Sequence, residues 1–210
     1  MKNTINVYIK TQENGKIPEY ASIHAAGCDL YATEDMALRP GETKVMPLDF
    51  IIAMEPEVEA QIRPRSGLSL KTQLRIPNGP GTIDSDYRDI VGVILENTYN
   101  ISNLPYQIAQ NPSLLNILKN EYKEIELGEY LSESGASSGF ASMDWGGVSI
   151  LKEKIYIDKH GNPFGTIYIR KGERIAQMIF SEYKRANFIY HPNAESIGKN
   201  RGGGFGHTGG

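Results

Sequence analysis

Short stretches of alternating apolar and polar residues recur along the chain and are separated by glycine and proline. Near the start, Ile5, Val7 and Ile9 alternate with polar or amphipathic neighbours, which is the two-residue period of a β-strand. Further β-rich runs cover residues 44–53, 58–62, 90–95, 154–157, 166–169 and 174–180. Many short strands with turn residues between them predict an all-β sandwich or barrel.

Two of these runs are separated by turn-forming residues. Residues 158–165 read DKHGNPFG and lie between KIYI and TIYIR. Glycine, proline, asparagine and aspartate in such a short connection are typical of a β-hairpin. We therefore predict that the strands at 154–157 and 166–169 pair with each other.

The pattern changes between residues 97 and 171. A run of apolar residues at helical spacing follows Asn111, a plausible N-cap, and Pro112 in the first turn. It is the only helix that the pattern indicates, and its apolar positions are Leu114, Leu115, Leu118, Tyr122 and Ile125. The serine- and glycine-rich stretch 132–147 after it predicts a loop.

Length and composition limit the classes of protein that fit. A chain of 210 residues accommodates one domain with an addition. A net charge of −3 gives no broad positive field for a nucleic-acid backbone. The single cysteine, Cys28, cannot form an internal disulfide, and no apolar run is long enough to span a bilayer. These features predict an intracellular protein of the cytoplasm, or of a host cell if the source is viral.

Two early segments carry candidate phosphate and metal chemistry. In AAGCDL, the small residues permit close backbone approach and Asp29 offers a carboxylate to a hard cation or its water shell. In RPRSGLSLK, Arg65, Ser66 and Gly67 combine a guanidinium with a hydroxyl and amides that suit phosphate oxygens. On its own, an aspartate such as Asp29 is usually only a turn residue, and a proline-glycine turn with solvated basic residues fits the second segment equally well.

The segment PNGPGTIDSDYRD is more informative. Asn78 and the residues after it describe a constrained hairpin whose backbone groups can face a base edge. Asp84 can accept a hydrogen bond from a water and orient it for in-line attack on phosphorus, which makes it our candidate catalytic base. The Tyr87 ring can lie against a deoxyribose and exclude a 2′-hydroxyl, although a packed core tyrosine is the simpler alternative.

Two late segments complete the set. In KGERIAQMIF, Gln177 can bind a phosphate or its water, while Arg174 fits a structural ion pair as well as a substrate contact. The end, RGGGFGHTGG, has too many glycines to fold alone. It predicts a closing lid in which Arg201 and Thr208 bind the terminal phosphate and Phe205 stacks on the base.

Taken in order, five segments closely resemble the five motifs of the homotrimeric dUTPase family, and the resemblance covers residues 1–97 and 165–210. These segments are AAGCDL, RPRSGLSLK, NGPGTIDSDYRD, GERIAQMIF and RGGGFGHTG. The resemblance implies a jelly-roll β-barrel subunit of a homotrimer with three shared active sites. It also implies cleavage of dUTP to dUMP and pyrophosphate with Mg²⁺, which Asp29 meets through water. The implied substrate-binding residues are Arg65, Ser66, Gly67, Asn78, Gly81, Thr82, Ile83, Tyr87, Gln177, Arg201, Phe205, Gly206, His207 and Thr208.

The chain departs from that pattern in three places. Asp89 stands where the family usually has glycine, and the tail is one residue shorter between Arg201 and Phe205, which shifts its reach by roughly 3.3 to 3.6 Å if extended. Residues 99–163 form an insertion between the third and fourth motifs, within a single domain of residues 1–210 whose arm covers 198–210.

The insertion leaves other functions open. Some phage relatives carry an insertion there that engages a protein partner, and Trp145 is a contact candidate by residue type, although a surface elaboration without a partner fits as well. A nucleotide-responsive regulator that acts through the insertion is therefore one alternative. A dCTP deaminase, which resembles this family in fold, is a weaker one, because GTIDSDYRD differs from its glutamate arrangement.

Overall fold

The described part of the chain is built mainly from short antiparallel strands. The computed structural model describes residues 4–133 and 150–199. Its largest sheet has the strand order β2-β3-β14-β7-β9. These strands are β2 (Glu19–Tyr20), β3 (Cys28–Tyr31), β14 (Arg174–Glu182), β7 (Val58–Arg63) and β9 (Gly81–Ile83).

A three-stranded sheet and three strand pairs make up the rest. The sheet has the order β5-β10-β8, and the pairs are β1-β6, β13-β4 and β11-β12. Their bounds are β5 (Thr43–Pro47), β10 (Gly92–Asn97), β8 (Leu74–Arg75), β1 (Tyr8–Thr11), β6 (Phe50–Ala53), β13 (Ile167–Ile169), β4 (Met36–Leu38), β11 (Lys123–Glu126) and β12 (Lys154–Ile157). The predicted all-β class is confirmed, and none of these sheets closes into a barrel within the residues described.

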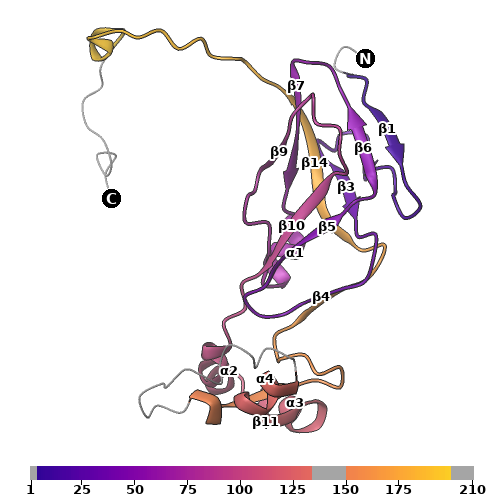
Figure 1. Cartoon of the computed structure of the whole chain (residues 1–210), viewed down its shortest axis with the longest axis vertical. Helices are drawn as coiled ribbons and strands as arrows, with labels where there is room; N and C mark the ends of the chain where they lie inside the picture. The colour runs from indigo at the N-terminus through magenta and orange to yellow at the C-terminus, as the bar shows by residue number, and fades with distance from the viewer. Residues whose placement is uncertain (1–3, 134–149, 200–210) are drawn as a thin grey trace.

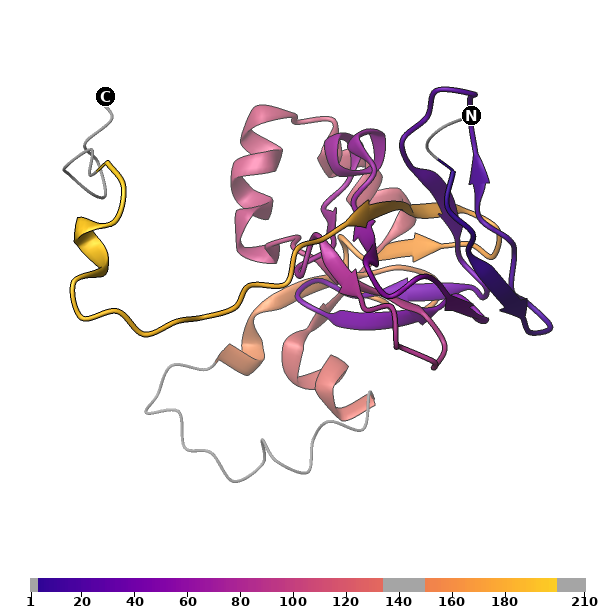
Figure 2. The same cartoon turned by 90° about the horizontal axis from the view of Figure 1, so that it is seen from above.

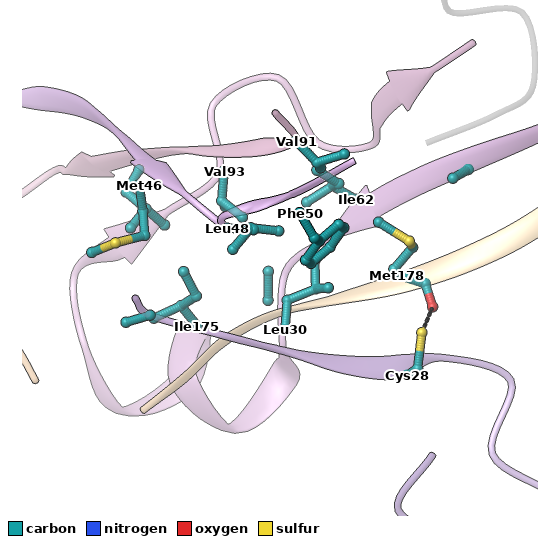
Figure 3. Packing of buried hydrophobic residues seen from close by; sticks show 14 of the residues in the cluster. Cys28, Leu30, Met46, Leu48, Phe50, Ile62, Val91, Val93, Ile175 and Met178 are labelled. Carbon is teal, nitrogen blue, oxygen red and sulfur yellow. Dashed lines mark hydrogen bonds between the residues drawn. The ribbon is translucent and has the colours of Figure 1, made fainter. Parts of the chain in front are cut away.

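Alternating side chains from both sheets fill one core. On β7, Val58, Ala60 and Ile62 are buried, and the residues between them are half-buried. Figure 3 shows Leu30, Ile62 and Met178 from the five-stranded sheet facing Met46 and Val93 from the three-stranded sheet. Phe50 on β6 lies between them and is 1% exposed. The two-residue period of the strands therefore turns one face of each sheet toward this core.

Most predicted strands form, but their ends and partners differ. The run at 5–9 becomes a strand only from Tyr8, and the run at 44–53 breaks into β5 and β6 at Asp49, whose φ is +51°. A left-handed residue reverses the chain direction, and aspartate tolerates it better than most residues. The predicted strands at 90–95 and 174–180 are β10 and β14 with shifted ends.

The predicted hairpin between 154–157 and 166–169 is wrong. β12 pairs with β11 and β13 pairs with β4, so only an isolated bridge from Ile157 to Pro163 joins the two segments. Residues 158–165 form the turn-rich connection as predicted, but it carries the chain from one sheet to another. Nearest-neighbour pairing is thus overridden by tertiary contacts.

The predicted helix forms in part. Helix α3 covers Leu114–Glu121, but Tyr122 is extended and Ile125 lies on β11, where it is 3% exposed. Pairing with β12 takes these residues out of the helix. Three further helices were not predicted: α1 (Ser66–Lys71), α2 (Leu104–Gln110) and α4 (Leu127–Glu133).

The segment that follows β10 folds at one end of the sheets (Figures 1 and 2). It contains α2, α3, α4, β11 and β12, with 3₁₀ turns at Ile101–Asn103 and Ile150–Lys152. Its buried apolar side chains are separate from the main core, and they are Leu104, Leu118, Ile125 and Ile157. The C-terminal segment leaves the end of β14 and runs away from the sheets to a 3₁₀ turn at Ala194–Ser196 (Figure 1).

Aromatic rings pack where the chain returns from this segment to β13. The Tyr99 and Tyr122 rings meet Phe164 edge-on, with centroids 5.7 and 5.1 Å away. Gly165 has a φ of +90°, and a Cβ on it would lie 2.2 Å from Cδ1 of Tyr99. Only glycine therefore fits at this position.

Replacing Gly165 with alanine should be costly for this reason. We expect Gly165→Ala to lower the free energy of unfolding by about 2–3 kcal/mol, because a left-handed backbone and an overpacked side chain both contribute. Gly161 is the matched control, since its φ is +76° but nothing lies within 4 Å of its would-be Cβ. Urea unfolding at one protein concentration would compare the two, and equal losses would contradict the steric account.

Candidate nucleotide site

A cavity of about 370 Å³ brings together three of the segments singled out in the sequence. Asp29 comes from β3, Gln177 from the neighbouring strand β14, and Arg65 from the N-cap of α1, two residues after β7. Small or apolar side chains line its other wall, and the full set is Ala21, Ala25, Ala26, Gly27, Asp29, Arg65, Ser66, Gly67, Arg174, Gln177 and Ile179. Residues far apart in the chain thus form one cationic pocket.

The Asp29 carboxylate holds two arginines in this cavity. Its Oδ1 lies 3.0 Å from Nε of Arg65, and its Oδ2 lies 3.1 Å from Nη1 of Arg174. Asp29 is 9% exposed, whereas the Arg174 side chain is 51% exposed. Two guanidinium groups against one carboxylate leave a net positive charge, which suits phosphate oxygens.

Gln177 lies beside this ion pair and is held by one hydrogen bond. Its Nε2 donates to the Pro64 carbonyl at 2.9 Å, and its Oε1 would lie 2.9 Å from a Cβ on Gly27. The absence of a side chain at Gly27 thus lets β3 and β14 approach closely at the cavity. The neighbouring thiol, Cys28, is 2% exposed, and burial raises its pKa, so it serves as a small core side chain.

Ser66 and Gly67 form the first turn of the short helix α1 and line the same cavity. The α1 hydrogen bonds that begin here run from the amides of Leu68 and Ser69 to the Arg65 carbonyl. The backbone amides of Ser66 and Gly67 lie in the first turn of α1, where amide groups have no hydrogen-bond partner within the helix. They can bind an anion beside Arg65.

The predicted base-reading hairpin does not form, because residues 76–80 connect β8 to β9 and these strands belong to different sheets and do not pair with each other. Strand β9 pairs only with β7, which leaves its other edge free in the described residues. The Asn78 side chain lies against Gly81, since its Nδ2 would be 3.0 Å from a Cβ there. Gly81, Thr82 and Ile83 are the whole of β9, so their backbone groups can pair with a base edge as another strand would.

Asp84 and Tyr87 lie in the turn after β9. Asp84 is exposed, and its carbonyl accepts the Tyr87 amide at 3.1 Å. The Tyr87 side chain is 39% exposed and donates its hydroxyl to the Ile90 carbonyl at 3.0 Å. Tyr87 is therefore an exposed ring and not the packed core tyrosine that was the alternative.

The register of the sheet separates Asp84 from the cavity. Ile83 pairs with Ala60, while Arg63 pairs with Gln177. The three residues from Ala60 to Arg63 span roughly 10 Å of extended strand. Neither Asp84 nor Tyr87 lines the cavity, so within one chain the cavity and the turn after β9 lie at separate places along β7.

The residues present do not form a dedicated metal cage. No group of three or more His, Cys, Asp or Glu side chains that could hold a metal ion occurs among the described residues. Both oxygens of Asp29 are occupied by arginines. This donor set fits Mg²⁺ only if the ion arrives on the phosphates and keeps several waters, which is its usual mode in nucleotide sites.

Several predictions cannot be placed. The predicted tail residues lie outside the described residues, and they are Arg201, Phe205, Gly206, His207 and Thr208. Trp145 and most of the predicted loop at 132–147 lie outside them as well. A larger cavity of about 890 Å³ lies between the segment that follows β10 and the β4-β13 pair, and it contains none of the predicted site residues. No described helix is long and apolar enough to cross a membrane.

Sequence reasoning left one contributor undecided. Arg174 fitted an ion pair or a substrate contact equally well, and the structure gives it an ion pair with Asp29 at the edge of the cavity. The deciding feature is the pairing of β14 with β3, which places Arg174 opposite Tyr31, two residues along β3 from Asp29. The local sequence around Arg174 does not indicate that β14 pairs with β3.

Comparisons with known proteins agree with this geometry. The dUTPase family model matches residues 13–111. The deoxyuridine 5'-triphosphate nucleotidohydrolase of Rickettsia akari is 38% identical over 143 residues, which are 65% of this chain and 95% of the relative. The Wolbachia pipientis enzyme of the same name is 42% identical over 129 residues, or 59% of this chain and 82% of the relative.

Solved phage structures share the fold. The dUTPase of Staphylococcus bacteriophage 80alpha, solved with dUpNHpp, has a TM-score of 0.66 and 22% identity, and covers 97% of this chain and 98% of its own. The dUTPase of phage phi11 of S. aureus, in which a species-specific insert was visualised, has a TM-score of 0.61 and 21% identity over 93% of this chain and 100% of its own. Together with the curated relatives, these matches show that the chain belongs to the dUTPase family.

Proposed function

We propose that this protein hydrolyses dUTP to dUMP and pyrophosphate. The observation that carries the proposal is the cavity in which Arg65, Arg174 and Gln177 surround Asp29, in a chain whose curated relatives are named deoxyuridine 5'-triphosphate nucleotidohydrolases. The reaction removes the precursor of uracil in DNA and supplies dUMP for dTMP synthesis.

The reaction needs a nucleophile, a base and neutralised charge. Asp84 accepts a proton from a water as the water oxygen bonds to the α-phosphorus, and the bond from that phosphorus to the bridging oxygen breaks. The electron pair of that bond leaves with pyrophosphate. The guanidiniums of Arg65 and Arg174 stabilise the charge on the phosphate oxygens. Mg²⁺, when bound to the phosphates near Asp29, supplies further charge neutralisation.

We assign uracil recognition to strand β9 and to the turn before it, which contains Asn78. The free edge of β9 supports backbone pairing of Gly81, Thr82 and Ile83 with the base, and Asn78 lies beside it. The half-exposed Tyr87 ring follows within four residues and can contact the sugar. A ring in that place would separate deoxyribose from ribose by excluding the 2′-hydroxyl.

We infer that the active site is shared between copies of the chain. A catalytic base must come within about 3 Å of the water that attacks phosphorus. The sheet register supports a shared site, because Ile83 pairs with Ala60 while Gln177 of the cavity pairs with Arg63, roughly 10 Å further along β7, and Asp84 does not line the cavity. We therefore assign the phosphate pocket to one protomer and the catalytic turn to its neighbour in a homotrimer. The tail residues Arg201, Phe205, Gly206, His207 and Thr208 would close the site from another protomer.

A substrate panel tests this function. Pyrophosphate release should be measured from dUTP, dCTP, dTTP and UTP with magnesium present. We expect dUTP to be cleaved at least tenfold faster than each of the others, because base and sugar are both read. Ammonia release from dCTP would instead identify a deaminase. Absence of pyrophosphate release from dUTP would refute the proposal.

A second, regulatory function is favoured by the surface of the inserted segment. Tyr106, Leu115 and Ile117 lie on α2 and α3 and are 77%, 38% and 42% exposed. Exposed large apolar residues are typical of contact surfaces. One phage 80alpha dUTPase structure is described as part of a mechanism that controls transfer of virulence genes. We propose that residues 99–163 contact a protein, and retained partner binding after their deletion would argue against this.

A further inference from the structure

The turn that carries the catalytic base has little packing to hold it. In residues 84–90, only Ser85 and Ile90 are even half-buried, and the other side chains are exposed. A surface loop without buried anchors takes its shape from its own hydrogen bonds. Apart from a hydrogen bond from the Ser85 hydroxyl to the Pro56 carbonyl at 3.3 Å, the placement of Asp84 and Tyr87 therefore depends on polar contacts within residues 84–90.

Arg88 supplies two of these contacts. Its Nη1 donates to the Ser85 carbonyl at 2.7 Å and to the Tyr87 carbonyl at 2.8 Å. The two carbonyls flank Asp86, so one cationic nitrogen fixes two peptide units of the turn. Hydrogen bonds from a charged donor are stronger than those between neutral groups. Ser85 follows Asp84 directly, which ties the base to this clamp.

Ile90 links Tyr87 to the core. Its carbonyl accepts the Tyr87 hydroxyl at 3.0 Å, and the same peptide unit donates the Val91 amide to the Phe50 carbonyl at 3.0 Å. Because Phe50 is buried on β6, this peptide unit has a fixed place. The Tyr87 ring is thus attached at its tip to a rigid strand.

Asp89 fixes the other side of Ile90. Its Oδ1 accepts the Ile90 amide at 2.7 Å. With both the amide and the carbonyl of Ile90 bonded, neither peptide unit flanking that residue is free to turn. The Asp89 carboxylate therefore acts on Tyr87 through one intervening residue.

We propose that Arg88 and Asp89 are positioning residues of the dUTPase reaction. Arg88 holds the Asp84 turn in its catalytic shape, and Asp89 holds the Tyr87 ring at the distance that excludes a ribose. The inference rests on the proposed function. It adds that sugar selectivity depends on a carboxylate that contacts neither substrate nor metal.

The first test concerns rate. Arg88→Ala should lower kcat/KM for dUTP at least tenfold, mainly through kcat, while the melting temperature stays within about 2 °C, because exposed contacts contribute little to stability. Arg170→Ala is the control, since Arg170 is exposed just beyond β13 and its side chain has no polar contact in the described part of the chain. A melting temperature that falls with the rate would show a structural role and overturn the inference for Arg88.

The second test concerns selectivity. Asp89→Ala should lower the ratio of kcat/KM for dUTP over UTP at least fivefold, whereas Asp89→Asn keeps the acceptor oxygen and should keep the ratio. Tyr87→Phe should lower the ratio of kcat/KM for dUTP over UTP by a similar factor. The double variant Asp89→Ala/Tyr87→Phe should lower that ratio no further than either single variant, because both substitutions break the same connection between the Tyr87 ring and Ile90. Asp86→Ala is the control, since the Asp86 carboxylate has no hydrogen bond or ion pair among the residues described.

The outcomes separate this inference from the proposed function. If the wild-type protein does not cleave dUTP, the function itself fails. If the wild type is active and the Asp89→Ala ratio stays within twofold of it, the positioning role of Asp89 is refuted. Additive losses in the double variant would also refute the link through Ile90.

Discussion

Asp84→Asn should lower kcat for dUTP hydrolysis by about 10²–10⁴-fold, the usual contribution of a positioned acid or base. The amide keeps the shape of the side chain but cannot accept the proton of the attacking water. KM should change little, because the phosphate cavity does not include Asp84. Steady-state pyrophosphate release over a range of dUTP concentrations measures both constants.

Asp86→Asn is the matched control for this prediction. It removes an exposed carboxylate from the same turn, two residues further on, and should retain the wild-type rate. If Asp84→Asn kept more than a tenth of the wild-type kcat, another group would have to be the base.

The second large effect is on stability. Asn97 is 0% exposed, and its Nδ2 donates to the carbonyls of Leu38 and Gly165, both at 2.9 Å. Its Oδ1 accepts the Tyr99 amide at 2.9 Å. One side chain therefore joins the end of β10 to β4, to the start of the inserted segment and to its return. Asn97→Ala should lower the free energy of unfolding by about 3–5 kcal/mol, because three backbone groups lose their partner.

Asn100→Ala provides the comparison for Asn97. The Asn100 side chain is solvent-accessible and accepts only the Ser102 amide at the start of a 3₁₀ turn. Loss of such a cap costs about 1 kcal/mol. Urea unfolding at one fixed protein concentration would rank the two, since assembly makes stability depend on concentration. Equal losses would mean that Asn97 does not tie these segments together.

Local pattern predicted the strands better than their partners. Strand β12 has the predicted bounds, and Val58, Ala60 and Ile62 on β7 alternate as expected. The pairing of β12 with β11 was missed because Ile125 continued the apolar spacing of α3 and was assigned to a helix. A short apolar run fits either period, and only the tertiary partner decides between them.

The sequence predicted which residues belong to the candidate site, but not how these residues are arranged in space. The motifs identified Asp29, Arg65 and Gln177, and the structure places all three in one cavity. They did not reveal that Arg174 shares the carboxylate of Asp29, or that β7 separates that cavity from Asp84. Both facts depend on strand register, which forms between residues distant in the chain.

Mixing two inactive variants tests the shared site most directly. Arg65→Ala removes the phosphate pocket and Asp84→Asn removes the base, and mixed trimers are obtained by co-expression with two tags. If each site takes Arg65 from one protomer and Asp84 from its neighbour, every mixed trimer has one intact site of three, so the mixed trimers should have about a third of wild-type activity and the unselected random mixture about a quarter. Mixed trimers no more active than either parent would contradict the account.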